Sequence, residues 1–400
     1  MRILKGLKIL DFSTLLPGPF ASMMLADMGA EVLRVEAPSR PDLLRVSPPF
    51  DGDQSAVHSY INRSKRSIAL DLKKQDSVEI IKRLVKEYDI VLEQFRPGVM
   101  ERLGLGYEAL KEANPRLIYC SLTGFGQTGP LRDRPGHDNN YLAISGVADY
   151  SRRKGAGPVP MGIQIADVAG GSFHTVIGIL AAALHRETTG EGQFIDVSMT
   201  DAAFALNAIY GPGYLACEIE PAPEATLLNG GTFYDYYQTK DGRYFSVGSI
   251  EPPFRKLLCE AIGHPEMIEI GLSEQPEDIA RFKEIVRKAF LSKTYAEWLD
   301  VFEDLHACVE PVLKFSEACA HPHIQAREMV VEVPKPDGST QKQIAFPIKF
   351  SSGKPLYKSI GSKFGENTVD VLLKLKFSQQ QIDEWREKGL FGQSRAGYDC

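Results

Sequence analysis

The first 125 residues alternate between short apolar runs and segments with helical spacing, a pattern typical of parallel α/β folds. Five apolar runs rich in strand-forming residues are predicted as strands: Leu7–Ser13, Ala30–Ala37, Ser67–Leu72, Asp89–Phe95 and Leu117–Thr123. Apolar residues recur at helical spacing in Phe20–Met28 and in 75–88. Strands and helices in this order form β-α-β units, so the sequence predicts a parallel sheet with right-handed crossovers.

The middle of the chain holds a long apolar segment, Gln164–Arg186, followed by a strand pattern over Gly192–Met199. Its uncharged part, Val168–Leu184, is slightly too short to span a bilayer and contains a histidine and three glycines. We therefore expect a buried core helix and no membrane association.

The pattern changes after Gly211–Glu224, a Gly- and Pro-containing stretch that we interpret as a linker. Phe233–Ile250 has the pattern of two strands around an Asp-Gly turn, and charged helical segments follow from 252 to about 320. The segment 366–388 predicts two short amphipathic helices.

Composition narrows the possible functions. The 400 residues carry a formal net charge of −6, with 43% hydrophobic and 24% charged residues, which excludes intrinsic disorder of the whole chain. A mildly acidic protein is a poor candidate for sequence-independent nucleic-acid binding. The six cysteines include no CxxC pair and the start lacks a signal-peptide core, so we expect a reduced, cytoplasmic protein without a disulfide framework.

Common nucleotide and metal motifs are missing or out of context. A GxGxxA match at 104–109 follows a helical segment, whereas a dinucleotide fingerprint follows a strand. The eight histidines are scattered, and no pattern of acidic or thiol ligands completes a metal site. A dinucleotide oxidoreductase is therefore a weak alternative, and we expect no metal.

Four cations lie near the predicted strands: Arg34, Lys65, Arg66 and Arg96. Parallel α/β sheets bind ligands at the carboxyl ends of their strands, and arginine can grip phosphate with two hydrogen bonds. These cations are candidates for an anion site, and solvated surface charge is the simpler alternative.

Acid–base candidates form a second group. His137 and Asp138 stand in a Gly-His-Asp sequence before a helical pattern, and Asp167 lies near the start of the apolar helix. Helix capping would explain Asp167, and Glu251 could likewise be a helix-start acid. A carboxylate in the apolar Ile-Ala-Asp-Val-Ala setting is nevertheless costly unless it is paired or used.

These segments together resemble the family III CoA-transferase (CaiB/BaiF-like) superfamily, and within it the α-methylacyl-CoA racemases. The matching pieces include LKILDFSTLLPGPF, NRSKRSIALDL, EQFRPGVMERLGLGYEAL, GHDNNYLAISGV, IQIADVAGG and VGSIEPPF. The resemblance implies a Rossmann-like CoA-binding α/β domain over 1–225, a smaller α+β domain over 226–325, and a return to the large domain over 326–400. It also implies two interlocked subunits.

The resemblance assigns roles to the candidate residues. In the racemases the residues matching His137 and Asp167 shuttle a proton, and the glutamate matching Glu251 partners the histidine. In the transferases the matching aspartate forms acyl intermediates, and an aromatic residue generally replaces the histidine. One position departs from the racemases: Ile163 stands four residues before Asp167, where they tend to carry asparagine.

The sequence thus predicts a racemase of 2-methylacyl-CoA thioesters. His137 and Asp167 would serve opposite faces of an enolate, Glu251 would orient His137, and the backbone N–H of Asp138 would stabilise the thioester oxygen. The four cations would hold CoA, which enters as part of the substrate, so no further cofactor is expected. The alternatives are a CoA-transferase that uses Asp167 as nucleophile and a non-catalytic CoA-ester binding protein.

Overall fold

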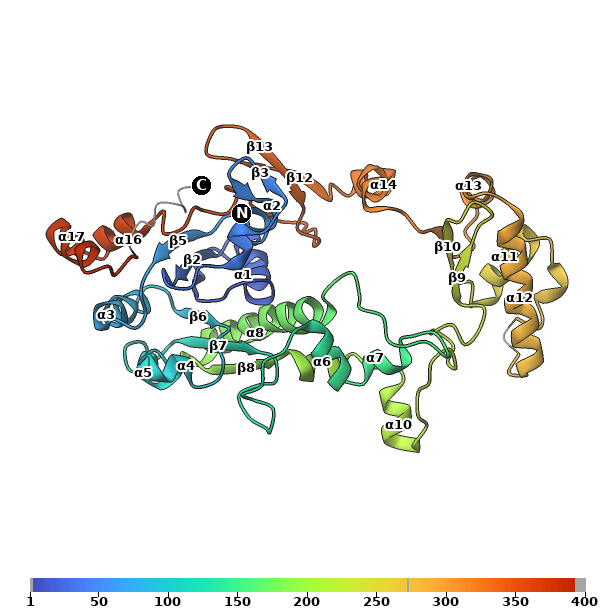
Figure 1. Ribbon diagram of the computed structural model, residues 1–400, viewed down its shortest axis with the longest axis horizontal. Helices are drawn as coiled ribbons and strands as arrows, with labels where there is room; N and C mark the ends of the chain where they lie inside the picture. Colours follow the sequence, from blue (N-terminus) through green and yellow to red (C-terminus); the bar gives the residue numbers. More distant parts are fainter. Residues whose placement is uncertain (1–2, 272, 393–400) are drawn as a thin grey trace. The chain divides into compact units, whose positions relative to one another are not determined.

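The chain folds into two compact units in the computed structural model, which describes residues 3–271 and 273–392 (Figure 1). Within these residues, unit 1 comprises 3–145, 161–205 and 323–392, and unit 2 comprises 146–160 and 206–322. Each unit is therefore built from segments that are distant in sequence. The assignment of 1–225, 226–325 and 326–400 to separate functional domains stays a prediction.

Unit 1 is built on a six-stranded sheet in the order β5-β2-β1-β6-β7-β8, in which every neighbouring pair is parallel. The strands are β1 (Lys8–Asp11), β2 (Glu31–Glu36), β5 (Arg66–Ala69), β6 (Ile90–Glu93), β7 (Ile118–Thr123) and β8 (Phe194–Ser198). The predicted strands and their parallel arrangement are confirmed. The chain proceeds from β1 through β2 to β5 in one direction and from β6 through β7 to β8 in the other, so the order reverses between β1 and β6.

Helices cover both faces of this sheet because successive strand residues point to opposite sides. Leu10, Leu33 and Val91 join one buried cluster with five helices. Those helices are α3 (Gln75–Leu84), α4 (Val99–Arg102), α5 (Tyr107–Lys111), α16 (Thr368–Lys374) and α17 (Gln379–Glu387). Strand residues of the opposite alternation, including Cys120, face α8 (Phe173–Thr189), and Cys120 and Thr175 of α8 are both fully buried. Helix α1 (Pro17–Asp27) packs against α8.

The helical stretch Ala166–Thr189 is, among the described residues, the one helix long and apolar enough to cross a membrane by length and composition. Such a segment is also typical of a core helix, and this one packs on β7 and β8. The sequence predicted that this segment is buried, but part of its apolar side is exposed. Phe173, Ile177 and Leu184 are exposed along one side of α8, so the described residues leave this apolar stripe uncovered.

The C-terminal segment returns to unit 1 and is fixed there by Arg63. The Arg63 guanidinium makes a paired contact with Asp27, with Nη2 to Oδ2 at 2.6 Å, and donates to the carbonyl of Ile344 at 2.6 Å. It also lies over the ring of Tyr357. Other elements of this unit include η1 (Leu43–Val46), β3 (Phe50–Asp51), β4 (Gln54–Ser55), α2 (Ala56–Ile61), α15 (Pro322–Ala326), β12 (Val330–Pro334) and β13 (Thr340–Ile344).

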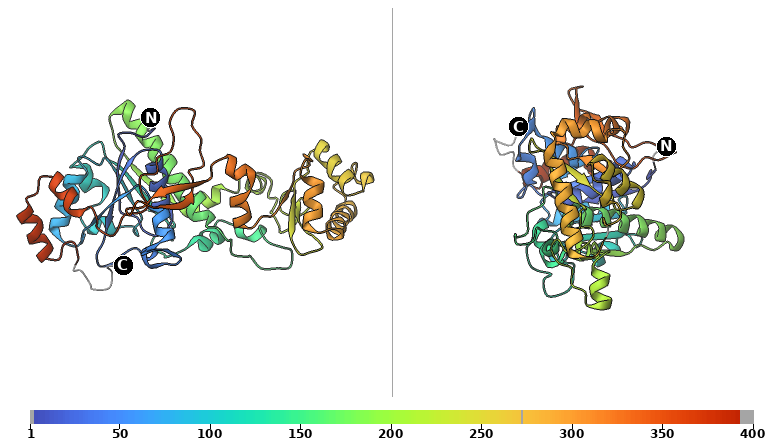
Figure 2. Two further views of the ribbon diagram at one scale, coloured as in Figure 1. Left: turned by 90° about the horizontal axis from the view of Figure 1, so that it is seen from above. Right: turned by 90° about the vertical axis from the view of Figure 1, so that its right-hand side faces the viewer.

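Unit 2 contains an antiparallel three-stranded sheet in the order β11-β10-β9, and helices lie along one face of it (Figure 2). The strands are β9 (Asp235–Gln238), β10 (Tyr244–Val247) and β11 (Val309–Pro311), and the helices are α11 (Pro252–Ala261), α12 (Pro276–Ser292) and α13 (Tyr295–Phe302). Phe245, Phe290 and Trp298 centre its aromatic core. The expected Asp-Gly hairpin is confirmed, since Gly242 has φ +81 in the β9–β10 turn.

Shorter elements complete unit 2. They are α7 (Val147–Tyr150), α10 (Gly211–Cys217), η3 (Pro265–Met267) and α14 (Phe315–Ala320). Helix α10 occupies the first half of the stretch that the composition suggested was a linker, so that interpretation was wrong for those residues. Pro212, at the second helical position, is compatible with this helix, because proline is well tolerated in the first turn.

Gly192, just before β8, provides a test of this packing. A Cβ placed there would lie 2.1 Å from the backbone oxygen of Leu117. We expect Gly192→Ala to lower the free energy of unfolding by at least the roughly 1–3 kcal/mol that overpacking costs, because a backbone atom must move. Gly157→Ala is the control, since no atom lies within 4 Å of its Cβ position. Equal urea midpoints for the two variants would contradict the close approach of Gly192 to the backbone of Leu117.

Candidate active site

His137 stands at the start of α6 (Asp138–Ile144). Its extended backbone, with φ −131 and ψ 172, turns the chain into the helix, and its N–H donates to Asn140 Oδ1 at 2.9 Å. The local sequence explains the turn, because an asparagine at the third helical position can accept from the residue that precedes the helix. His137 is exposed, so its imidazole is accessible to a substrate.

Asp167 lies on the π-helical turn η2 (Ala166–Ser172), which precedes α8. Wide turns of this kind are rare and occur often at functional sites. The glycines that follow let the turn approach α9 (Met199–Ala205), since a Cβ at Gly170 would lie 3.3 Å from the carbonyl oxygen of Met199. Ser172 Oγ donates to the carbonyl of Pro17 at 2.7 Å, which joins the turn to the start of α1.

The structure brings His137, Asp138 and Asp167 together, which sequence spacing alone did not establish. The backbone N–H of Asp167 donates to Asp138 Oδ1 at 3.0 Å. Partial burial, and then the nearby Asp138 carboxylate, raise the pKa of Asp167 to about 6, and His137 opposes this rise. The aspartate is therefore prepared to bind or release a proton near neutral pH, as a general acid or base must.

Tyr141 is a member of this cluster that the sequence did not single out. Its ring is 4% exposed and fills a slot between two glycines, since a Cβ at Gly124 or Gly136 would lie 2.5 or 2.6 Å from it. Burial, followed by the charges of Asp167 and Asp138, raises the pKa of the Tyr141 hydroxyl to about 12. The sequence signal that could have identified Tyr141 is its spacing of four residues from His137, which places both on the same side of the α6 segment.

Glu251 belongs to unit 2 and stands immediately before α11. Its carbonyl accepts the N–H of Arg255 at 2.9 Å, and its side chain is exposed. The charge of Glu251 contributes to raising the pKa of the neighbouring Cys308 thiol, after burial. The expected pairing of Glu251 with His137 stays a prediction, because the two residues lie in different units.

Two of the four expected CoA-binding cations are buried in ion pairs. Arg34 Nη2 lies 2.9 Å from Asp42 Oδ2, and Lys65 Nζ lies 3.5 Å from Asp11 Oδ2 and donates to the carbonyl of Pro19 at 2.7 Å. Burial lowers the pKa of Lys65 to about 7, although Asp11 opposes the shift. Both cations are committed to internal partners in this conformation.

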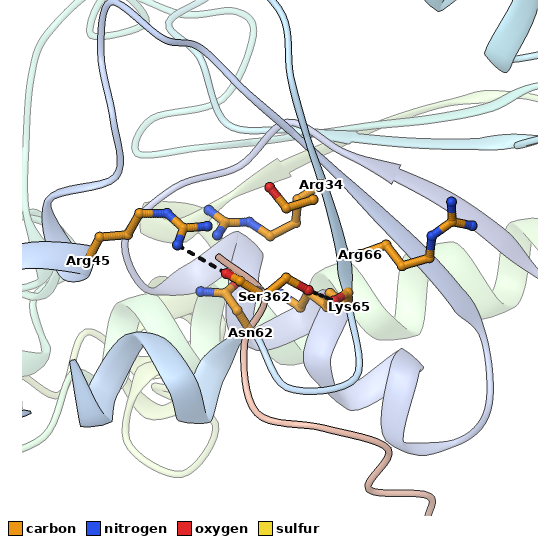
Figure 3. A pocket seen from close by; sticks show the side chains of 7 residues that line it. Arg34, Arg45, Asn62, Lys65, Arg66 and Ser362 are labelled. Atoms are coloured by element: carbon orange, nitrogen blue, oxygen red, sulfur yellow. Dashed lines mark hydrogen bonds between the residues drawn. The ribbon is translucent and has the colours of Figure 1, made fainter. Parts of the chain in front are cut away.

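Figure 3 shows Arg34 and Lys65 beside Arg45, Asn62 and Ser362. The space among these residues is about 130 Å³ and leaves no room for the centre of a water molecule. A phosphate group therefore cannot enter between the two buried cations without rearrangement. The role of Arg34 and Lys65 as direct CoA ligands stays a prediction, and their contacts with Asp42, Asp11 and Pro19 stabilise the chain around the loop after β1.

Arg66 and Arg96 are more accessible. Arg66 is half-buried and pairs with Glu31 at 3.4 Å and Asp370 at 3.0 Å. Arg96 is exposed in the loop after β6, where the strand order reverses. Open parallel sheets bind ligands at this switch point. The adjoining Gln94 accepts the N–H of Gly18 at 3.0 Å, which links the start of α1 to the loop after β6.

The cluster on unit 1 supports two kinds of chemistry. An imidazole and a carboxyl group with a pKa of about 6 can exchange protons with a carbon acid, and the same carboxylate can act as a nucleophile. In the part of the chain that the structure describes, no group of three or more His, Cys, Asp or Glu side chains is arranged to hold a metal ion.

Comparisons with known proteins agree with this arrangement. The chain is 37% identical over 383 residues to an α-methylacyl-CoA racemase of Mus musculus, covering 95% of each sequence. It is 31% identical to a human succinyl-CoA:glutarate CoA-transferase, covering 98% of this chain and 90% of that one. A CAIB/BAIF family protein from Brucella suis has a similar structure, with a TM-score of 0.81, 29% identity, and 93% and 99% of the two chains covered. The model of CoA-transferase family III matches residues 4–368, and the chain therefore belongs to this family.

Proposed function

We propose that the protein racemises 2-methylacyl-CoA thioesters by 1,1-proton transfer through an enolate. The observation that carries this proposal is the cluster of His137, Asp138 and Asp167, with Asp138 bound to the backbone of Asp167. The transferases generally place an aromatic residue where this chain has His137. The similarity to a racemase over nearly the whole chain also supports the proposal.

The proposed reaction needs two acid–base groups on opposite faces of the α-carbon. His137 removes the α-proton from one face, and the C–H electron pair moves into the thioester to give an enolate. Protonated Asp167 then delivers a proton to the opposite face, which inverts the centre. The roles are exchanged for the other enantiomer, and no electrons are gained or lost overall.

The enolate oxygen requires a hydrogen-bond donor as its charge develops. Asp138 is the first residue of α6, and the first N–H groups of a helix have no partner within the helix. We assign its backbone N–H to the thioester oxygen. Removing one such donor typically costs about 10²–10³-fold in rate.

We place the CoA part of the substrate at the switch point between β1 and β6. Arg96 is the exposed cation there, and Arg66 lies at the start of β5. Arg34 and Lys65 are buried and contribute indirectly, because their contacts hold the loop that follows β1. The thioester supplies the acidity of the α-hydrogen, so the proposed reaction requires CoA only as part of the substrate and no further cofactor.

We also propose that the protein functions as an interlocked homodimer. Phe173, Ile177 and Leu184 form an exposed apolar stripe on α8, with 39, 61 and 70% of each residue accessible. Large apolar patches on one face of a helix commonly mark contact with another protein chain. A second copy would cover this stripe, and neither a membrane nor a nucleic acid is needed as a partner.

A CoA-transferase is the second candidate function. The partly buried carboxylate of Asp167 could attack a thioester carbonyl, expel the CoA thiolate and form a mixed anhydride. Family members with transferase names align with nearly all of this chain, which favours this alternative. Asp167 has a part in both reactions, whereas His137 is required only for racemisation.

Isotope exchange separates the two reactions. A single enantiomer of a 2-methylacyl-CoA in deuterated water should lose optical activity and gain one α-deuterium in the presence of the protein, as followed by polarimetry and mass spectrometry. Absence of α-deuterium together with CoA transfer to an added carboxylic acid would support the transferase instead. Binding of the thioester with neither reaction would support a non-catalytic binding protein.

Substitution of the histidine tests its proposed role. His137→Ala should lower the racemisation rate by about 10²–10⁴-fold, the usual contribution of a general base. Circular dichroism should be unchanged because His137 is exposed. His264→Ala is the control, since that imidazole lies in unit 2 and contacts Glu266 at 2.9 Å. A His137→Ala variant that keeps most of its turnover would rule out the two-base mechanism.

The pH profile tests the coupling of the two aspartates. In the direction in which Asp167 removes the α-proton, its carboxylate must be ionised, so the rate should fall as pH drops through the Asp167 pKa of about 6. Asp138 raises the pKa of Asp167, so Asp138→Asn should move this acid limb to lower pH while its side-chain oxygen can still accept the Asp167 N–H. An unchanged acid limb would contradict the assignment to Asp167.

A further inference from the structure

The backbone of Asp167 is held at both of its polar groups by side chains of unit 1. Asp167 lies in the first turn of its helix, where N–H groups have no partner within the helix, and its N–H donates to Asp138 Oδ1 at 3.0 Å. Its carbonyl accepts from Ser172 Oγ at 3.2 Å. These two contacts orient the peptide planes on both sides of the Asp167 Cα, and so the direction in which its side chain leaves the backbone.

The helix changes its spacing at Asp167. The N–H of Val168 donates to the carbonyl of Gln164, four residues back, at 3.0 Å, whereas the N–H of Phe173 donates to the carbonyl of Val168, five residues back. Turns of this width are rare in helices. Side-chain contacts accompany the widening: besides the Ser172 hydroxyl, His174 Nδ1 lies 2.7 Å from the carbonyl oxygen of Gly170.

Ser172 connects the widened turn to α1. It is fully buried, and its one hydroxyl proton lies between two carbonyl groups. Oγ is 2.7 Å from the carbonyl oxygen of Pro17, the first residue of α1, and 3.2 Å from that of Asp167. All three residues belong to unit 1, so the contact does not depend on how the two units are placed.

Ser172 is the one side chain of η2, other than Asp167 itself, that can hydrogen-bond. The four residues between them, 168–171, are Val, Ala, Gly and Gly and carry no polar side chain. The two glycines permit a close approach to α9, but glycine restricts the backbone less than any other residue. Removal of the Ser172 hydroxyl therefore leaves the carbonyl of Asp167 without its side-chain contact, in the part of the helix whose backbone is least restricted.

We propose that Ser172 is a positioning residue for Asp167: its hydroxyl holds the carbonyl of Asp167 against the first turn of α1 and thereby directs the Asp167 carboxyl group at the α-carbon of the substrate. This inference rests on the proposed function. The two side chains that hold Asp167 then have different tasks. Asp138 contributes a charge as well as a contact, whereas Ser172 contributes geometry alone.

Ser172→Ala, with Thr368→Val as its matched control, provides the test. Thr368 is also buried in unit 1, and its hydroxyl donates to the carbonyl of Gly365 at 2.6 Å, at the start of α16. Each variant removes one buried hydroxyl from a carbonyl, so the Tm of each should fall by no more than about 6 °C.

The two variants should differ in turnover. Ser172→Ala should lower kcat about tenfold, since misplacement of a reacting group by 1 Å can cost as much as 10²-fold. The KM for the thioester should stay within about twofold, because the lost contact serves the chemical step and not the binding of CoA. Thr368→Val should keep the kcat of the wild type.

The isotope pattern separates a positioning role from a structural one. In deuterated water His137 can remove an α-proton and return a deuteron to the same face, because its exposed imidazole exchanges protons with solvent. A displaced Asp167 leaves this exchange intact and slows only the steps on its own face. In Ser172→Ala, the ratio of α-deuterium incorporation to inversion should therefore rise for the enantiomer whose α-proton faces His137, and not for the other. Loss of folded protein would lower both rates and leave the ratio unchanged.

A second readout does not depend on turnover. Amide hydrogen exchange should increase in peptides that cover 166–173 of Ser172→Ala, because the turn has lost its hydrogen bond to α1. The same peptides of Thr368→Val should exchange as in the wild type.

An unchanged ratio of deuterium incorporation to inversion in Ser172→Ala would overturn the inference, as would equal kcat and equal exchange in the two variants. If the wild type catalyses CoA transfer instead, the kcat of transfer replaces the isotope ratio, since Asp167 is then the nucleophile. If the wild type catalyses neither reaction, the proposed function fails, and the exchange measurement still decides whether Ser172 holds the turn.

Discussion

The loop after β1 is fixed by charges that are buried beneath it, and the geometry of unit 1 depends on this constraint. Asp42 accepts from Arg34 at 2.9 Å and from the backbone of Leu15, whose φ of +61 is unusual for a leucine. Removing one partner of a buried ion pair typically costs about 3–5 kcal/mol, because the other charge remains desolvated. The loop is therefore held in a conformation that the chain would not adopt by itself.

The consequences of this constraint extend to the proposed active site. Pro17, the first residue of α1 directly after the fixed loop, accepts from Ser172, which shares the π-helical turn with Asp167. Gly18, the next residue, is bound to Gln94 after β6, beside Arg96. The proposed CoA position and the proposed catalytic aspartate are thus connected through the first turn of α1, and the buried cations serve the site by holding the loop that leads into this turn.

The sequence by itself determined the strands of the parallel α/β sheet and the Asp-Gly hairpin of unit 2. It also placed His137 and Asp167 in recognisable motifs. Hydrophobic periodicity and short motifs are local, so they can be recognised along a single chain. Only the tertiary structure decided that Asp138 binds the backbone of Asp167, that Tyr141 lies in the same cluster, and that Arg34 and Lys65 are buried in ion pairs. These facts depend on contacts between residues that are distant in sequence, where burial and the nearby charges, rather than residue type, set the role of each ionisable group.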